Sequence, residues 1–289
     1  MLRSLLLFLF VALSTPLVAS GDDVKLFENQ RYCESEGKAG LCDVYKPNAP
    51  APSDGYPVVV VVHGGGWISG DKWTLEGYSR LLARNGYVAV TINYRLAPEH
   101  KFPAQVDDVR QALLWVKTNA SRFSLDLKRL GMFGYSAGGH LSALVAALAD
   151  EPVDVQSEAS SWDKADEKWS QLPSIRAVCA GGPPCDFRGF SKENKSLSYF
   201  LGGSRGELPG VYRAASPAAH VSKKDPVTQI IHGDQDIIVP IEGSREFHQA
   251  QVDAGVDSRL HELAGQGHMV TFINPKTSEL LLDFFRDVL

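Results

Sequence analysis

The sequence has no surplus of positive charge. Its 29 lysines and arginines are outnumbered by 34 aspartates and glutamates, which gives a formal net charge of −5 at pH 7. Proteins that bind nucleic acids concentrate basic side chains on one surface, and this composition provides no such excess. We therefore expect no nucleic-acid partner.

Long apolar runs are also scarce. One of them covers residues 5–13, behind the positive charge of Arg3, and small residues fill positions 18–20 before Gly21. This run is too short to cross a hydrocarbon core of about 30 Å as a helix. The pattern is typical of a cleavable signal peptide over residues 1–20, which predicts a secreted or periplasmic protein without stable insertion in a membrane.

Cysteine is rare, and the 4 cysteines form two close pairs, Cys33 with Cys42 and Cys179 with Cys185. In an oxidising compartment close pairs favour disulfides, so we expect the two local pairings. A zinc site is the weaker alternative, because neither pair has the spacing of a zinc knuckle and no histidine cluster lies nearby. No histidine stands in an H-E-x-x-H arrangement, so no metal or cofactor is expected.

The rest of the composition is that of a globular protein, with 44% hydrophobic and 22% charged residues. Residues 58–62 form an unbroken β-branched run, typical of a strand buried on both faces of a parallel sheet. Further strands are expected at residues 88–92, 130–133, 175–178, 227–231 and 258–263, and helices at residues 75–84, 104–118, 137–149, 241–254 and 276–289. This alternation predicts one α/β domain over residues 21–289, a mostly parallel sheet with helices on both faces.

Residues 150–171 interrupt the alternation. This segment is rich in acidic residues, contains Trp162 and Trp169, and shows neither a helical nor a strand period. We interpret it as a surface insertion, which is either a lid over a site or a solvated loop.

The strongest chemical signal is a G-x-S-x-G pentapeptide at residues 134–138, between an expected strand and an expected helix. A nucleophile in this arrangement stands on a sharp, strained turn, where glycines avoid crowding between the strand and the helix. Ser136 is therefore the candidate nucleophile. The amide of Ala137, at the start of the helix, is a candidate donor to an oxyanion.

A serine hydroxyl needs a base that takes its proton, and the base needs a carboxylate that fixes its tautomer. His268 follows the strand at residues 258–263 on a glycine-rich loop. Asp234 and Asp236 both follow the strand at residues 227–231, at the sheet edge where open α/β proteins bind their ligands. The chain order serine, aspartate, histidine is that of α/β-hydrolases and differs from the two common serine-protease orders.

A second glycine-rich loop, with the sequence HGGGW at residues 63–67, follows the first buried strand. Its backbone amides can point at a developing oxyanion, so Gly64 and Gly65 are the expected donors together with Ala137. A phosphate-binding loop is the rival interpretation, but Asp71 stands where the lysine of that motif should follow.

With these motifs the chain resembles the α/β-hydrolase superfamily, in particular the carboxylesterases related to hormone-sensitive lipase, and nearest to these the bacterial acetyl and feruloyl esterases. The sequence NYRLAPE at residues 93–99 and the segment at residues 102–108 also carry the resemblance. The family pattern H-G-x-x-D-x-x-V-P matches residues 232–240, which implies that Asp236, not Asp234, is the acid of the triad.

Two departures narrow the resemblance. Tyr135 stands where the lipase-like branch usually has an acidic residue, and the chain lacks that branch's long amino-terminal cap. The shorter form resembles esterases that remove acetyl or feruloyl groups from plant polysaccharides. It implies a secreted serine carboxylesterase that hydrolyses short-chain esters of sugars through an acyl-enzyme, without a cofactor.

The missing cap also predicts an open site with little apolar cover. The alternatives are an amidase on the same fold, either an arylformamidase or a small peptidase, a short-chain lipase, and a non-catalytic binding module.

Overall fold

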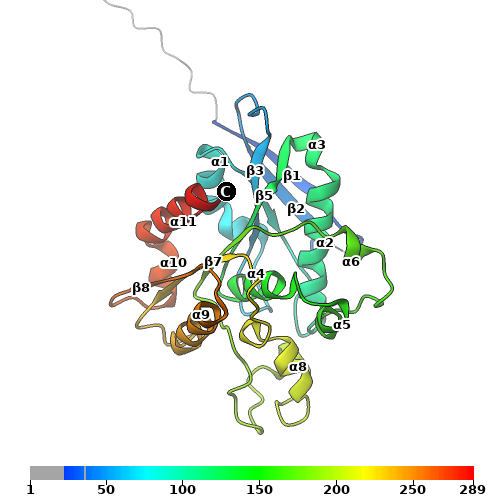
Figure 1. Cartoon of the computed structure of the whole chain (residues 1–289), viewed down its shortest axis with the longest axis vertical. Helices are drawn as coiled ribbons and strands as arrows, with labels where there is room; N and C mark the ends of the chain where they lie inside the picture. Colours follow the sequence, from blue (N-terminus) through cyan, green and yellow to red (C-terminus); the bar gives the residue numbers. More distant parts are fainter. Residues whose placement is uncertain (1–22, 36) are drawn as a thin grey trace, which may run out of the picture.

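The computed structural model describes residues 23–35 and 37–289, so the expected signal peptide lies outside the described residues. Within these described residues the strands form one sheet of 8 strands (Figure 1). Its strands are β1 (Val24–Arg31), β2 (Leu41–Pro47), β3 (Tyr56–Val62), β4 (Val88–Ile92), β5 (Leu125–Tyr135), β6 (Ala177–Gly181), β7 (Val227–Gly233) and β8 (Ser258–Leu263). Their spatial order is β1-β2-β4-β3-β5-β6-β7-β8. β1 and β2 pair in antiparallel fashion, β2 pairs with β4 likewise, and the remaining pairs are parallel.

The helices connect these strands. They are α1 (Glu76–Arg84), α2 (Ala104–Thr118), α3 (Ala120–Phe123), α4 (Ala137–Leu148), α5 (Val153–Gln156), α6 (Lys168–Gln171), α7 (Ser198–Leu201), α8 (Pro209–Ala214), α9 (Glu242–Ala254), α10 (His268–Ile273) and α11 (Pro275–Val288), with short 3-10 turns at η1 (Lys72–Leu75), η2 (Ser157–Ala159) and η3 (Pro217–Ala219). None of the described helices is long and apolar enough to cross a membrane.

Helices cover both faces of the sheet, as expected. In β3, Val58, Val60 and Val62 pack with α2 and α4, whereas Val59 and Val61 pack with α1 and α11. This two-sided burial explains the unbroken β-branched run, because neither face of the strand meets water. The expected α/β architecture is therefore confirmed.

Most strands of the parallel part begin or end within a few residues of their expected bounds. The strands β4 and β8 and the helix α2 have the expected bounds. The sequence pattern predicts no bounds for β1 and β2. β2 contains charged residues, and its Asp43 is buried because the Lys72 ammonium lies 2.6 Å from its carboxylate. Lys72 is 29 positions away from Asp43 in the sequence. The residues around Asp43 therefore show no local pattern that indicates a buried strand.

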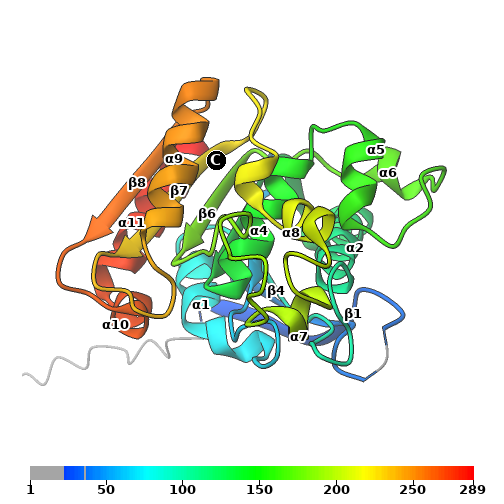
Figure 2. The ribbon, with the colours of Figure 1, turned by 90° about the horizontal axis from the view of Figure 1, so that it is seen from below.

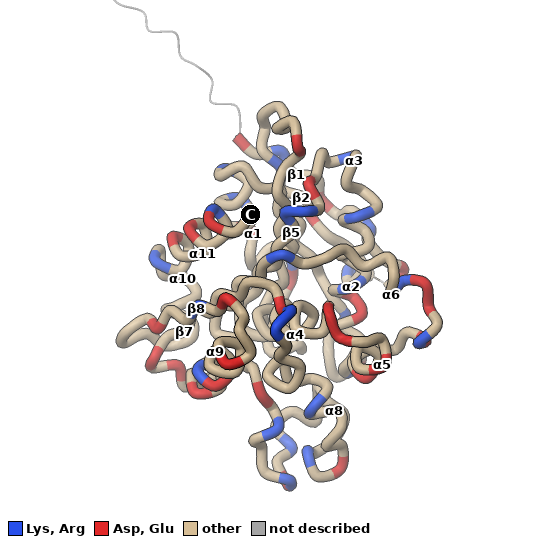
Figure 3. The backbone as a smooth tube through the Cα atoms, in the orientation of Figure 1, with Lys and Arg blue, Asp and Glu red and all other residues tan. Residues whose placement is uncertain are grey.

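Residues 150–171 form a surface insertion with several acidic side chains (Figure 3). The segment contains α5, η2 and α6 and is fastened to α2. Ser160 and Ser161 donate hydrogen bonds to Asp107, and the Arg110 guanidinium donates to the Ala159 carbonyl at 2.8 Å. This insertion covers the outer side of α2.

The two expected disulfides are wrong for this structure, since all four cysteines are free. Cys179 packs in the apolar cluster beneath α11, while Cys185 packs with Phe247 of α9 in a separate cluster. These clusters lie on different sides of the sheet, so closeness in sequence does not bring the two sulfur atoms together. In the β1–β2 ladder Cys42 lies opposite Gln30, and the Cys33 thiol instead donates to the Ser35 hydroxyl.

The carboxyl ends of the parallel strands meet at one edge of the sheet. Figure 2 shows this edge toward the bottom of the view, where α10 and α1 lie. The loops after β3, β5, β7 and β8 carry the candidate residues to this edge.

Candidate active site

The turn between β5 and α4 holds Ser136 in a strained conformation. Its φ is 56° and its ψ is −123°, a left-handed region that non-glycine residues avoid. A β-carbon at Gly138 would lie 2.0 Å from the carbonyl oxygen of Val62, and one at Gly134 would lie 2.2 Å from the Gly138 carbonyl oxygen. Both glycines of the motif are therefore required by close backbone packing, and the turn lifts Ser136 above the sheet edge.

His268 and Asp236 come together at the same edge. The Nδ1 atom of His268 lies 2.5 Å from Oδ2 of Asp236, and both side chains are buried. The other carboxylate oxygen accepts the backbone N–H groups of Ile238 at 2.9 Å and Val239 at 2.8 Å. Asp234 instead accepts the amide of Gly265 in an exposed contact, so the structure pairs His268 with Asp236 and not with Asp234.

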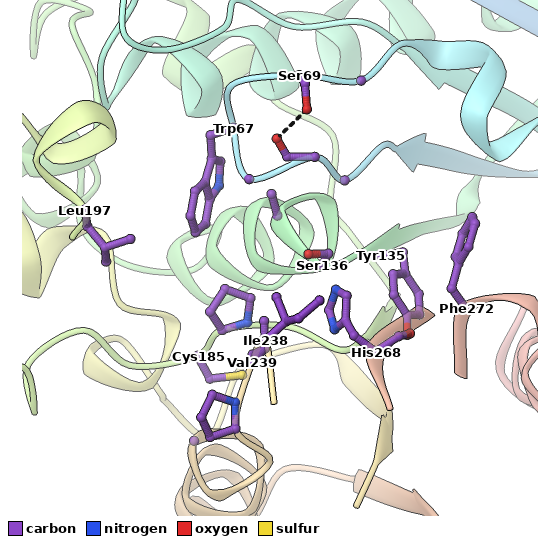
Figure 4. A pocket seen from close by; sticks show the side chains of 18 of the residues that line it. Trp67, Ser69, Tyr135, Ser136, Cys185, Leu197, Ile238, Val239, His268 and Phe272 are labelled. Carbon is purple, nitrogen blue, oxygen red and sulfur yellow. Dashed lines mark hydrogen bonds between the residues drawn. The ribbon is translucent and has the colours of Figure 1, made fainter. Parts of the chain in front are cut away.

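The imidazole of His268 points toward Ser136 (Figure 4). Both side chains line one cavity. The Tyr135 hydroxyl donates a hydrogen bond of 2.6 Å to the backbone carbonyl of His268, and the Tyr135 ring packs edge-on against the imidazole. Tyr135, which departs from the lipase-like pattern, thus helps to fix the position of His268.

His232 also belongs to this site, although the sequence motif that contains it assigns it no role. Its Nε2 donates to the Val239 carbonyl at 2.9 Å and lies 3.1 Å from Oδ2 of Asp236. Its Nδ1 lies 2.8 Å from the Ser244 hydroxyl, which donates to it. Burial lowers the pKa of His232, so the ring is neutral and holds the loop that carries Asp236.

The glycine loop after β3 lies directly against the nucleophile. A β-carbon at Gly64 would come within 2.7 Å of the Tyr135 carbonyl oxygen and 3.2 Å of the Ser136 β-carbon. The Ser69 hydroxyl donates to the Gly65 carbonyl at 3.0 Å, and this bond closes the loop (Figure 4). The amides of Gly64, Gly65 and Ala137 donate to no other group within the described chain, so they are available to an oxyanion.

Trp67 both packs the loop and lines the cavity. Its indole stacks on Phe200 at 4.3 Å, and its Nε1 donates to Nδ1 of His140 at 3.2 Å. The Nε2 of His140 in turn donates to the Ala215 carbonyl at 2.7 Å. Burial lowers the pKa of His140 to about 4, so this histidine is a neutral packing residue beside the elbow.

The cavity has a volume of about 780 Å³, and apolar side chains cover much of it. Residues of the β6–β7 connection form much of its wall: Pro184, Cys185, Phe187, Phe190, Leu197 and Tyr199. None of residues 150–171 lines it. The expectation of an open site with little apolar cover is wrong, because the β6–β7 connection, and not the acidic insertion, supplies an apolar wall.

No three histidine, cysteine, aspartate or glutamate side chains are grouped to hold a metal ion in the part of the chain that the structure describes. The cavity brings together the Ser136 hydroxyl, the imidazole of His268 with the Asp236 carboxylate behind it, and the backbone amides of the glycine loop.

The sheet topology, the elbow and the glycine loop define the class of this protein as an α/β-hydrolase. More narrowly, the BD-FAE family matches residues 42–251, and the chain belongs to this family. The match includes Ser136 and Asp236 and ends before His268. This finding confirms the resemblance of the sequence motifs to those of α/β-hydrolase carboxylesterases.

The chain is also similar to named relatives. It is 30% identical to Esterase LipC of Mycobacterium tuberculosis over 83% of this chain and 59% of LipC, so it spans little more than half of that protein. Its fold matches a truncated form of a carbohydrate esterase from gut microbiota, with a TM-score of 0.79 and 24% identity over 92% of this chain and 97% of that chain. A bifunctional GH43-CE protein of Bacteroides eggerthii matches with a TM-score of 0.78 and 25% identity, over 92% of this chain and 38% of that chain.

The buried histidines make stability depend on pH. Burial lowers the pKa of His63 and of His140 to about 4, from a value of 6.5. Between about pH 4 and pH 6.5 these histidines bind more protons in the unfolded chain than in the folded protein. The free energy of unfolding therefore falls as the pH falls, by up to about 3 kcal/mol for each ring. Urea denaturation between pH 7 and pH 4.5 should show this loss.

The variant His140→Gln separates this effect from general acid unfolding. Glutamine can still donate to the Ala215 carbonyl but cannot be protonated, so the variant should have a shallower pH dependence than the natural protein. Equal slopes for the two proteins would contradict a neutral, buried ring at position 140.

Proposed function

We propose that the protein is a serine carboxylesterase in which Ser136, His268 and Asp236 form the catalytic triad. The observation that supports this most directly is the short contact between His268 Nδ1 and Asp236, at a cavity that Ser136 and the glycine loop also line. Because the Asp236 carboxylate can only accept, the imidazole proton lies on Nδ1. The lone pair of Nε2 is then free to take the serine proton.

The reaction follows from this arrangement. Ser136 Oγ attacks the ester carbonyl carbon while its proton passes to His268 Nε2, and the carbonyl electron pair moves to the oxygen. The amides of Gly64, Gly65 and Ala137 stabilise the oxyanion. His268 then protonates the leaving alcohol, the ester bond breaks, and a water molecule activated by the same imidazole hydrolyses the acyl-enzyme.

The proposed substrates are acetyl or feruloyl-type esters of carbohydrates. Membership of the BD-FAE family supports this, as does the similarity to a GH43-CE protein. The cavity offers aromatic surface at Trp67, Phe187 and Phe190, which suits a planar aromatic acyl group. Export directed by residues 1–20 would bring the protein to extracellular polymers.

A second candidate function, a short-chain lipase, is favoured by exposed apolar side chains near the cavity. Ile238 and Met269 line the cavity and are mostly exposed, and Val270 and Ile273 continue an exposed apolar surface along α10. A series of p-nitrophenyl esters distinguishes the two functions. Activity that falls from butyryl to octanoyl supports the carbohydrate esterase, whereas activity that rises to decanoyl and increases on emulsions supports the lipase.

Ser136→Ala tests the proposed nucleophile. Removing the hydroxyl leaves nothing to form the acyl-enzyme, so kcat for p-nitrophenyl acetate should fall by about 10³ or more. Ser142→Ala is the matched control, because Ser142 is buried on the same helix α4 and outside the cavity. Near-normal hydrolysis by Ser136→Ala, or labelling of another residue by a fluorophosphonate, would refute the assignment.

Asp236→Asn tests the proposed acid against its neighbour. An asparagine amide would favour the wrong tautomer of His268, so kcat should fall by about 10³ to 10⁴ while the fold is kept. Asp234→Asn should change kcat little, because Asp234 bonds only the amide of Gly265 near the surface. Similar small losses in both variants would show that the acid of the reaction is elsewhere.

Phe190→Ala tests the proposed binding of an aromatic acyl group. Loss of an aromatic wall should lower kcat/KM for methyl ferulate by roughly tenfold, since truncating a contact aromatic often costs more than 1 kcal/mol. Hydrolysis of p-nitrophenyl acetate should change much less, because the acetyl group does not reach this wall. Phe27→Ala on β1 removes an equally half-buried ring outside the cavity and serves as the control. Equal losses on both esters would argue against an aromatic acyl site at Phe190.

A further inference from the structure

A second hollow lies beside the catalytic cavity, and the two share a wall. Its volume is about 280 Å³, and it is lined mainly by polar side chains of β1, β2 and the segment around η1: Leu26, Glu28, Asn29, Lys38, Asp43, Tyr45, Asp71, Lys72, Trp73, Glu76 and Asn93. Residues 69–76 form the shared wall. Ser69, Gly70, Thr74 and Leu75 face the cavity, whereas the residues between and after them line the hollow.

The floor of this hollow is built from buried, paired polar groups. The Lys72 ammonium lies 2.6 Å from the Asp43 carboxylate, and the backbone amide of Asn29 donates to the same carboxylate at 2.6 Å. The Asn93 side chain accepts the backbone amide of Lys72 at 2.6 Å. Asn29 has a φ of 53° at an irregularity of the β1–β2 ladder, which turns this part of β1 toward the hollow. The polar groups of the floor therefore already have partners within the protein, which hold them in place.

Tyr45 is different, because its hydroxyl has no hydrogen-bond partner among the described residues. The side chain is only 2% exposed and lines the hollow, while the Arg80 guanidinium lies 5.5 Å from the centre of its ring. Because this hydroxyl is not fully buried, it reaches the open space of the hollow. A ligand hydroxyl can bond to it there in place of water.

Trp73 gives the hollow an apolar edge. Its side chain is 65% exposed, which is unusual for so large an aromatic group. Around it, Glu28 and Asp71 offer carboxylate oxygens and Lys38 offers an ammonium group. The carboxylates of Asp43 and Glu76 are balanced by Lys72 and by Arg80, so the remaining groups supply acceptors and a donor of opposite charge.

This combination suits a neutral sugar ring. A pyranose has an apolar face of C–H groups, which would pack on the Trp73 indole, and a rim of hydroxyls, which would bond to the surrounding acceptors and donors. A cation would meet the carboxylates of Glu28 and Asp71 but also the ammonium group of Lys38, since Lys72 is already paired with Asp43. A metal ion has no suitable group of ligands among the described side chains.

We infer that this hollow is a sugar-binding subsite, which holds a neutral sugar unit of the polysaccharide whose ester is placed at Ser136. The inference rests on the proposed function, since it names the polymer that carries the ester. The shared wall of residues 69–76 is the reason for joining the two sites, because a chain lying across it would contact Trp73 on one side and the cavity on the other.

Binding without turnover tests the subsite directly. Calorimetric titration of the Ser136→Ala protein with xylotetraose should give saturable binding. Adding Trp73→Ala should weaken it by about tenfold, because Trp73 provides the largest contact surface. Tyr45→Phe, which keeps the buried ring, should weaken it by a smaller factor, and Trp162→Ala in the acidic insertion should leave it unchanged.

Kinetics of the active protein give the second readout. Trp73→Ala should lower kcat/KM on acetylated xylan by about tenfold and leave kcat/KM for p-nitrophenyl acetate within about twofold, because the small ester does not span the shared wall. The Trp162→Ala protein should match the natural protein on both substrates.

Several results would overturn the subsite. These are the absence of xylotetraose binding, binding that is insensitive to both Trp73→Ala and Tyr45→Phe, and saturable binding of spermidine in place of the sugar, which would identify a cation site. Failure of the proposed function is a separate result. It would appear as no ester hydrolysis by the natural protein, while the titrations of Ser136→Ala would still report on sugar binding.

Discussion

The site depends on how closely the backbone after β3 approaches the backbone after β5. A β-carbon at Gly138 would come within 2.0 Å of the Val62 carbonyl oxygen, and one at Gly64 within 2.7 Å of the Tyr135 carbonyl oxygen. Only glycines allow this approach, which brings the free amides of the HGGGW loop beside the strained turn at Ser136. The positive φ of Ser136 is maintained because the surrounding backbone leaves the turn no room to relax.

The carboxylate of Asp236 is the electrostatic centre of the same edge. It accepts two backbone amides and lies within hydrogen-bond distance of two imidazoles, so a buried negative charge is satisfied from every side. Neutral His232 adds a donor without adding charge, and its contact with the Val239 carbonyl fixes the loop. The direction of the His268 ring is therefore set by a rigid anchor, which the proposed role of His268 as a base requires.

The sequence predicted those features that depend on local pattern. Buried parallel strands are unbroken apolar runs, and the elbow is a motif with a fixed place between β5 and α4, so both could be found. Asp236 was distinguished from Asp234 only by a resemblance, because two acids on one loop have the same local signal. The geometry agrees with that choice through the contact to His268.

Features that depend on distant contacts could not be found in this way. Asp43 is buried in β2 only because Lys72 neutralises it, and the Cys179 and Cys185 side chains pack on different sides of the sheet although they are close in sequence. The cover of the cavity comes from Phe187, Phe190 and their neighbours after β6, a stretch without a strong period. Its role follows from the topology, which leads that connection across the carboxyl edge.

The segment that follows the glycine loop connects the amides proposed for the oxyanion with the proposed sugar subsite. A β-carbon at Gly70 would lie 2.4 Å from the His63 ring, so the loop is folded tightly against the end of β3. Asp71 then caps η1, and Lys72 is held by Asp43. The amides proposed for the oxyanion and the wall proposed for the sugar therefore belong to one rigid stretch of chain. A sugar held at Trp73 would be held in fixed register with those amides, so that binding energy gained far from the ester serves to orient the reacting carbonyl.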